Sequence, residues 1–202
     1  MTEVTDAPHR MTEPATLDLD AAERAVADLM KALGMDVGNE SLAATPRRLV
    51  KAYAELLQPQ HVRATTFPNE SGYDGLVVVN DIWFRSICEH HLLPFSGVVS
   101  VGYLPGREII GLSKLARIVA NVAARPQVQE RLTNDIADWL ERVVGGEGVG
   151  VTVHASHSCM TLRGARAVGS MTATSVVRHR MRTDDLCYRE FIRLSDLGSS
   201  NR

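Results

Sequence analysis

Residues 113–146 read SKLARIVANVAARPQVQERLTNDIADWLERVVGG and carry two amphipathic helical patterns in succession. Apolar side chains recur at helical spacing over residues 115–122 and again over residues 128–143. The Arg-Pro pair at 125–126 breaks the first pattern, and the two glycines at 145–146 end the second. This stretch therefore predicts a pair of central helices joined by a short connection.

Segments with strand character lie on both sides of the helical pair. The expected strands are residues 76–79, 82–84, 97–103, 108–110, 149–155, 172–177 and 188–194. We expect the first four to form two hairpins. Because strands and helices do not alternate one by one, the pattern predicts an α+β protein with a largely antiparallel sheet.

The part of the chain before the strands is expected to be helical. Apolar residues recur at helical spacing over residues 18–33 and 46–57, whereas residues 1–16 show no periodicity. The sequence thus predicts a flexible tail at 1–16, an N-terminal helical segment at 17–60 and a main domain at 61–202.

Composition excludes several classes of protein. With 45% apolar and 23% charged residues in 202, the chain is typical of a globular protein, and 5% aromatic residues argue against a surface that stacks nucleic-acid bases. No apolar run is long enough to span a membrane and the first residues do not resemble a signal peptide, so we expect no membrane partner and a cytoplasmic location. Residues 46–202 hold 19 bases and 15 acids, a net charge of +4 that suits an anionic ligand.

Two short motifs combine cysteine with histidine, CEHH at 88–91 and HSC at 157–159. Three cysteines do not make a disulfide framework, and sulfur together with imidazole is a donor set that selects zinc. Cys88 and His91 would face opposite sides of a straight strand, so the chain must turn between them to bring both to one ion.

The number of protein ligands decides what kind of zinc site this is. Four donors, Cys88, His91, His157 and Cys159, would close a structural site, whereas three donors and a water molecule would make a catalytic one. His157 and Cys159 would share a face if their strand continues. The sequence leaves the choice open. In the three-donor case His90 is available for acid–base chemistry.

A candidate anion site lies at the start of the first central helix. Ser113 and Lys114 follow Gly111 there, so backbone amides and the positive end of the helix dipole meet a hydroxyl and an ammonium group. Arg117 lies one turn further along the same helix. Other candidate anion-binding residues are Arg48, Lys51 and Arg163. Together with the zinc motifs, these residues indicate a phosphorylated small molecule.

Gln129 and Glu130 form a second candidate binding pair, at the start of the next helix. A carboxylate beside an amide can accept from the ring N–H and the exocyclic amine of a guanine. A Gln-Glu pair on a helix is more often a solvated surface, so this motif alone is weak evidence.

Three longer motifs give the chain a specific resemblance. They are CEHHLLP at 88–94, IGLSKLAR at 110–117 and RPQVQERLT at 125–133. With these motifs the chain resembles the GTP cyclohydrolase I family, over residues from about 18 to 194.

The resemblance implies a zinc ion held by Cys88, His91 and Cys159, with one position left for water. The implied reaction is hydrolytic opening of the imidazole ring of GTP, release of formate and rearrangement to 7,8-dihydroneopterin triphosphate, the first step of pterin and folate biosynthesis. The implied proton-transfer groups are His90, His157 and Ser113. Gln129 and Glu130 would anchor the guanine, and the implied triphosphate ligands are Arg48, Lys51, Lys114, Arg117 and Arg163.

The resemblance also implies an architecture, the tunnelling fold. In this fold an antiparallel sheet carries two helices on one face and the sheets of neighbouring subunits join into a barrel, giving a homodecamer whose sites are shared between subunits. N-terminal helices precede this catalytic domain. Residues 178–189, RHRMRTDDLCYR, depart from the family pattern because they lack an expected glycine and contain Cys187, which has no histidine beside it. Ser158 also replaces a bulkier residue.

Two other functions compete with this interpretation. One is a sibling enzyme of the same fold, such as a nicotinamide-dependent nitrile reductase, which needs a nucleophilic cysteine that is not a metal ligand. The other is a non-catalytic, zinc-stabilised binding module. Deamination of the cytidine type is disfavoured because its His-x-Glu and Pro-Cys-x-x-Cys motifs are missing.

Overall fold

The computed structural model describes residues 16–59, 62–145 and 147–197, so nearly all of the predicted tail at 1–16 lies outside the described residues. The chain divides into two compact units, with the boundary between Gln58 and Pro59. The first unit contains helices α1 (Leu19–Ala32), α2 (Glu40–Ala43) and α3 (Thr45–Leu57), of which α1 and α3 pack together. The expected N-terminal helices are present, and the short helix α2 was not predicted.

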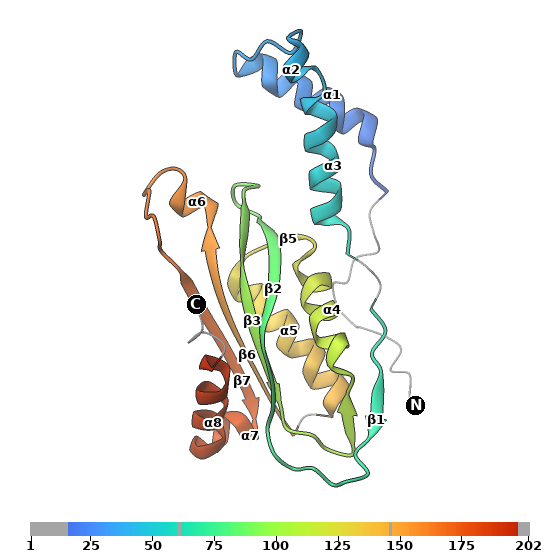
Figure 1. Ribbon diagram of the computed structural model, residues 1–202, viewed down its shortest axis with the longest axis vertical. Helices are drawn as coiled ribbons and strands as arrows, with labels where there is room; N and C mark the ends of the chain where they lie inside the picture. Colours follow the sequence, from blue (N-terminus) through green and yellow to red (C-terminus); the bar gives the residue numbers. More distant parts are fainter. Residues whose placement is uncertain (1–15, 60–61, 146, 198–202) are drawn as a thin grey trace. The chain divides into compact units, whose positions relative to one another are not determined.

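The second unit is built on a five-stranded sheet in the order β5-β2-β3-β6-β7 (Figure 1). Its strands are β2 (Val77–Cys88), β3 (Pro94–Tyr103), β5 (Pro126–Gln127), β6 (Gly148–His157) and β7 (Thr172–His179). The pairs β2/β3, β3/β6 and β6/β7 are antiparallel, and the two-residue strand β5 runs parallel to the end of β2. The α+β class with a largely antiparallel sheet is therefore confirmed.

Neither predicted hairpin before the helices forms. Residues 76–79 and 82–84 belong to one continuous strand, β2, whose register with β3 shifts between Val79 and Ile82. Asp81 has φ 54° at this irregularity, which is a β-bulge that lets the strand continue rather than reverse. Strand β4 (Glu108–Ile110) pairs with β1 (Thr66–Pro68) and not with β3.

Helices α4 (Leu112–Ala123) and α5 (Gln129–Val144) cover one face of the sheet, as Figure 1 shows. Their buried residues include Leu115, Ile118, Val119, Leu132, Ile136 and Leu140, packed in one core with Val99, Val101, Val151 and Val153 of the sheet. The expected two helices on one face are thus present. Among the described helices, none is both long and apolar enough to cross a membrane.

The C-terminal segment covers part of the other face. Residues 188–194, predicted as a strand, lie in helix α8 (Asp185–Asp196), which follows the short helix α7 (Arg180–Thr183). Phe191 of α8 packs over Gly102 and Gly150, which are paired across β3 and β6. A Cβ atom at either glycine would lie within 2.8 Å of the Phe191 ring, so the sheet accepts this ring only where it carries no side chain.

Candidate functional site

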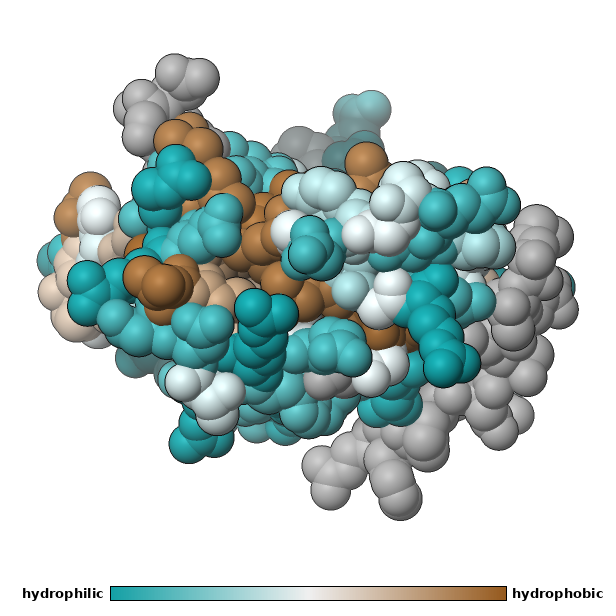
Figure 2. Space-filling model, turned by 90° about the horizontal axis from the view of Figure 1, so that it is seen from below, coloured by the Kyte–Doolittle hydropathy of each residue, from teal (hydrophilic) through white to brown (hydrophobic). Residues whose placement is uncertain are grey.

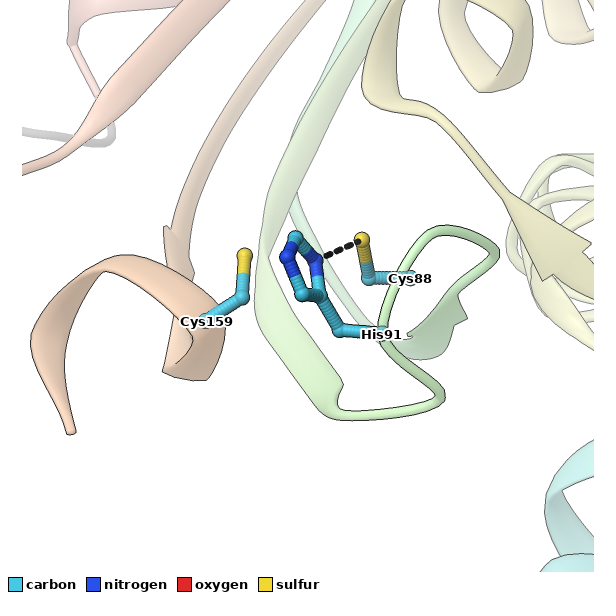
Figure 3. Close-up of side chains that lie close together, drawn as sticks. All are labelled: Cys88, His91 and Cys159. Carbon is cyan, nitrogen blue, oxygen red and sulfur yellow. Dashed lines mark hydrogen bonds between the residues drawn. The ribbon is translucent and has the colours of Figure 1, made fainter. Parts of the chain in front are cut away.

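Cys88, His91 and Cys159 form a group of possible metal ligands at one end of the sheet (Figure 3). Their ligand atoms all lie within 4.8 Å of one another, and Cys88 Sγ is 3.7 Å from His91 Nδ1. Two sulfurs and one imidazole nitrogen at this spacing fit a zinc ion. His157 does not belong to the group found in the described residues, which contains three donors.

A tight turn after β2 brings His91 back to Cys88. The Cys88 carbonyl accepts hydrogen bonds from the amides of His91 (3.3 Å) and Leu92 (2.9 Å), and the Cys88 amide donates to Leu93 O at 2.9 Å. Leu92 has φ 52°, a left-handed conformation that reverses the chain. The turn that the sequence required between the two ligands is therefore present. We call residues 88–93 the metal turn.

Cys159 reaches the metal turn by a different route from the one predicted. Strand β6 ends at His157, and Cys159 lies in the short helix α6 (Ser158–Thr161), so the two residues do not share a strand face. His157 pairs with Phe95 of β3, the residue next to the start of that strand. This register places the end of β6 beside the metal turn and brings together the two motifs.

The two cysteines of the group oppose each other's ionisation. Burial, followed by the neighbouring Cys88 sulfur, raises the pKa of the Cys159 thiol, and the positive charge of Arg163 opposes this shift. Two adjacent sulfurs cannot both ionise readily without a positive charge between them, and a divalent metal ion supplies it. Arg163 also lies close enough to the cluster to act on it electrostatically.

His157 is held next to the three ligands by contacts to its ring. The imidazole stacks on Phe95, with centroids 4.4 Å apart and an interplanar angle of 6°. Its Nε2 lies 2.8 Å from Gln129 Oε1. Burial lowers the pKa of His157, and the exposed carboxylate of Glu130 opposes this shift. His157 thus lies at the site as a half-buried imidazole near an acidic side chain.

Gln129 occupies a buried position behind His157, with 1% of its surface exposed. Its amide nitrogen faces Thr172 O at 2.9 Å, Val153 O at 3.1 Å and Thr174 Oγ1 at 3.2 Å. The prediction that this amide brackets a guanine together with Glu130 disagrees with the placement, because both polar atoms of the amide already have partners inside the protein. Only Glu130 presents an exposed side chain.

Residues near Gln129 and Glu130 contact the metal turn. Arg131 forms an ion pair with Glu89, and the Glu89 amide donates to Gln127 O at 3.1 Å. The rings of His90 and His91 diverge, with centroids 6.3 Å apart and an interplanar angle of 87°. His90 is exposed and is not one of the three clustered donors among the described residues. Arg131 and Phe95 were not predicted from the sequence, because no local pattern identifies a side chain that supports a ligand from another segment.

The predicted anion site lies at the other end of the sheet. Gly111 caps α4, with Ser113 and Lys114 in its first turn, and the Ile110 amide donates to Tyr103 Oη at 3.1 Å. Tyr103 is the last residue of β3, whereas the metal turn leads into its first. At about 3.3 Å per residue this strand spans about 30 Å. A single chain therefore does not bring Ser113, Lys114 and the nearby Arg117 to the metal ligands.

The remaining predicted phosphate ligands fall into two groups. Arg163 follows α6 near Cys159, as its effect on that thiol indicates. Arg48 and Lys51 lie on α3, in the N-terminal unit.

Comparison with known proteins identifies the family. The family model described as GTP cyclohydrolase I matches residues 22–196. The chain is 42% identical to GTP cyclohydrolase 1 of Rhodopirellula baltica over 96% of this chain and 84% of the relative. It is 46% identical to GTP cyclohydrolase 1 of Streptomyces coelicolor (85% and 92% covered) and 42% identical to that of Aquifex aeolicus (88% and 97% covered). The chain therefore belongs to the GTP cyclohydrolase I family.

Proposed function

We propose that this chain catalyses the zinc-dependent hydrolytic opening of the imidazole ring of GTP. C8 leaves as formate, and the remainder rearranges to 7,8-dihydroneopterin triphosphate, the first step of pterin and folate biosynthesis. The observation that carries the proposal is the group of Cys88, His91 and Cys159 beside His157, in a chain of this family.

The three ligands would hold zinc, and the bound ion would supply a water molecule of lowered pKa for attack on C8. His157 gives a proton to N7 of the guanine as the ring opens. Glu130 accepts hydrogen bonds from the ring N–H and exocyclic amine of the base, which fixes C8 toward the ligands. Its exposure next to His157 supports this role.

The triphosphate and the ribose are assigned to the basic and hydroxyl groups. Arg163 binds phosphate on the side of the metal turn, and Lys114 and Arg117 bind it at the start of α4. His90 and Ser113 exchange protons with the ribose during its rearrangement. Arg48 and Lys51, in the N-terminal unit, are also assigned to the triphosphate.

Because about 30 Å separate the two ends of β3, this assignment requires a second copy of the chain. We propose a homo-oligomer, a decamer, in which the α4 start of one copy meets the metal turn of another. Within the described residues, one edge of β7 has no strand beside it, and β2 pairs on its outer side with β5 only at Ile87 and Cys88. Open sheet edges favour pairing with another copy. Figure 2, which shows the structure of Figure 1 from below, also shows apolar surface exposed among polar side chains.

The test is to incubate the purified protein with GTP and to follow formate and the pterin chromophore. Both are expected, both should disappear on treatment with a chelator, and both should return with zinc. Zinc binding without formate release would identify a non-catalytic module, and nicotinamide consumption with a nitrile substrate would identify the sibling reductase. Light scattering tests the assembly, and a monomer at working concentration would contradict shared sites.

A further inference from the structure

We infer that Gln129 is a positioning residue that fixes the orientation and the tautomer of His157. In this arrangement His157 Nε2 keeps its hydrogen, and Nδ1 is the atom that exchanges a proton with the substrate. The catalytic meaning of this inference rests on the proposed function, whereas the tautomer itself does not.

The first step is the orientation of the Gln129 amide. Thr133 Oγ1 donates to Gln129 O at 2.7 Å, so its own hydrogen is used. Thr133 and Thr174 hydroxyls lie 2.6 Å apart, and Thr174 must therefore donate to Thr133. Thr174 then turns a lone pair toward Gln129, alongside the carbonyl oxygens of Val153 and Thr172. Only the NH2 group of the amide fits against these acceptors.

The second step follows from the other end of the same amide. With its nitrogen fixed, Gln129 presents Oε1 to His157 Nε2 at 2.8 Å. An amide oxygen only accepts, so Nε2 must carry a hydrogen. Gln129 is 1% exposed, so water does not compete for this bond. A neutral imidazole has one N–H group, and Nδ1 therefore carries its lone pair.

The third step is that the ring cannot turn to avoid this assignment. Phe95 is 1% exposed and stacks nearly parallel on the imidazole, so a tilt of the ring would break the stack. A half-turn about the Cβ–Cγ bond would keep the stack but place a carbon where Nε2 now meets Gln129 Oε1. Gln129 fixes one edge of the ring and Phe95 fixes its plane. Groups from α5, β3, β6 and β7 take part, which gives the imidazole a rigid support.

The chemical consequence concerns the proton given to guanine N7. The His157 imidazolium carries hydrogen on both nitrogens. Its Nδ1–H bond breaks, the N7–H bond forms, and the positive charge passes to the base. Nε2–H stays bonded to Gln129 Oε1 throughout, so His157 returns to the same neutral tautomer without rotating.

The variant Gln129→Met tests the inference, because methionine has a similar length and its thioether sulfur is only a weak acceptor for the Nε2–H group. We expect kcat to fall by about 10- to 100-fold, the usual effect of removing a group that orients another. In the His157→Ala background the same change should have no further effect on kcat. GTP affinity, measured in that slow background, should stay unchanged. Thr174→Val is the matched control, since it perturbs the same cluster but leaves two carbonyl acceptors for the amide.

Equal losses of kcat in both backgrounds, or weaker GTP binding, would overturn the positioning role. A direct guanine contact would give the second result. If Gln129→Met does not fold, nitrogen-15 spectra of the histidine-labelled unmodified protein decide the matter, with the His157 signal assigned by its loss in His157→Ala. A neutral Nδ1–H tautomer would refute the inference. Failure of the unmodified protein to release formate would instead refute the proposed function and leave the tautomer test intact.

Discussion

Arg131 forms an ion pair with Glu89, the residue that directly follows the ligand Cys88, and its Nε also donates to Gln127 Oε1 at 2.8 Å. This side chain of α5 therefore supports the metal turn at the place where backbone residues 87–89 pair with residues 126–127. The hydrogen bond from Arg131 also lowers the pKa of Glu89. Glu89 is therefore held in its ionised form, which keeps the ion pair with Arg131 and so stabilises the metal turn.

Arg131→Met should weaken zinc binding by about 10- to 100-fold, because loss of a group behind a ligand loosens the ligand geometry. Competition with a chromogenic chelator measures the affinity. Arg142→Met is the matched control, since Arg142 is an exposed base at the far end of the same helix. Equal zinc affinity in both variants would show that the ion pair does not support the site.

Cys88→Ser and Cys159→Ser should each lose zinc and formate release together, since each removes one of three protein ligands. The control is Cys187→Ser, because Cys187 is a buried cysteine that packs with Phe191 in a second, smaller core cluster. Cys187→Ser should retain its metal, measured by atomic absorption. Full activity in either ligand variant would contradict the ligand assignment.

His157→Ala should retain zinc and slow ring opening by about two to four orders of magnitude, the usual contribution of a general acid. Metal content and the rate of formate release are measured on the same sample. Loss of zinc in this variant would instead support the closed, four-ligand site that the sequence left open.

Lys114→Ala should weaken the binding of GTP more than that of guanosine, because its partner is the triphosphate. If sites are shared between copies of the chain, a more specific outcome is expected in mixed oligomers. At a GTP concentration that does not saturate Lys114→Ala, a mixed oligomer of Lys114→Ala and Cys88→Ser chains should show more activity than the sum of the two variants measured separately, since some sites then combine an intact α4 start with an intact metal turn. Absence of recovery in verified mixed oligomers would count against sites shared in this way.

Glu141 should make the stability of the fold depend on pH in the acidic range. Hydrogen bonds from Arg178, at 2.6 Å, and from His179 lower the pKa of Glu141. A carboxyl with a lowered pKa in the folded state stabilises that state above its unfolded pKa, near 4.3, and this contribution is lost as pH falls through the lower folded value. Denaturant unfolding should show the stability difference between unmodified protein and Glu141→Gln shrinking as pH falls below about 4.

Features that are set by residues close together in the sequence were predicted correctly. Features that are set by contacts with other segments were not. The two central helices and the Cys-His-Cys group follow from helical spacing and ligand chemistry. The bulge at Asp81 could not be foreseen, because a break in strand alternation also suits a turn. Helix α8 was mistaken for a strand because Tyr188, Phe191 and Ile192 favour strands, while its cap at Asp184 was overlooked.

The same distinction applies to the site. Gln129 and Glu130 are adjacent in the sequence, yet one is buried and the other exposed, and only packing against β6 and β7 decides which. The separation of Lys114 from the metal ligands likewise follows from the length and direction of β3 and not from a motif.

The packing of Phe191 over Gly102 and Gly150 has a consequence for the nascent chain during translation. The strands that carry both glycines emerge well before residue 191, so the back of the sheet stays bare during the later part of translation. Nascent chains at that stage expose an uncovered β-surface, which is the kind of surface that chaperones bind and that promotes aggregation.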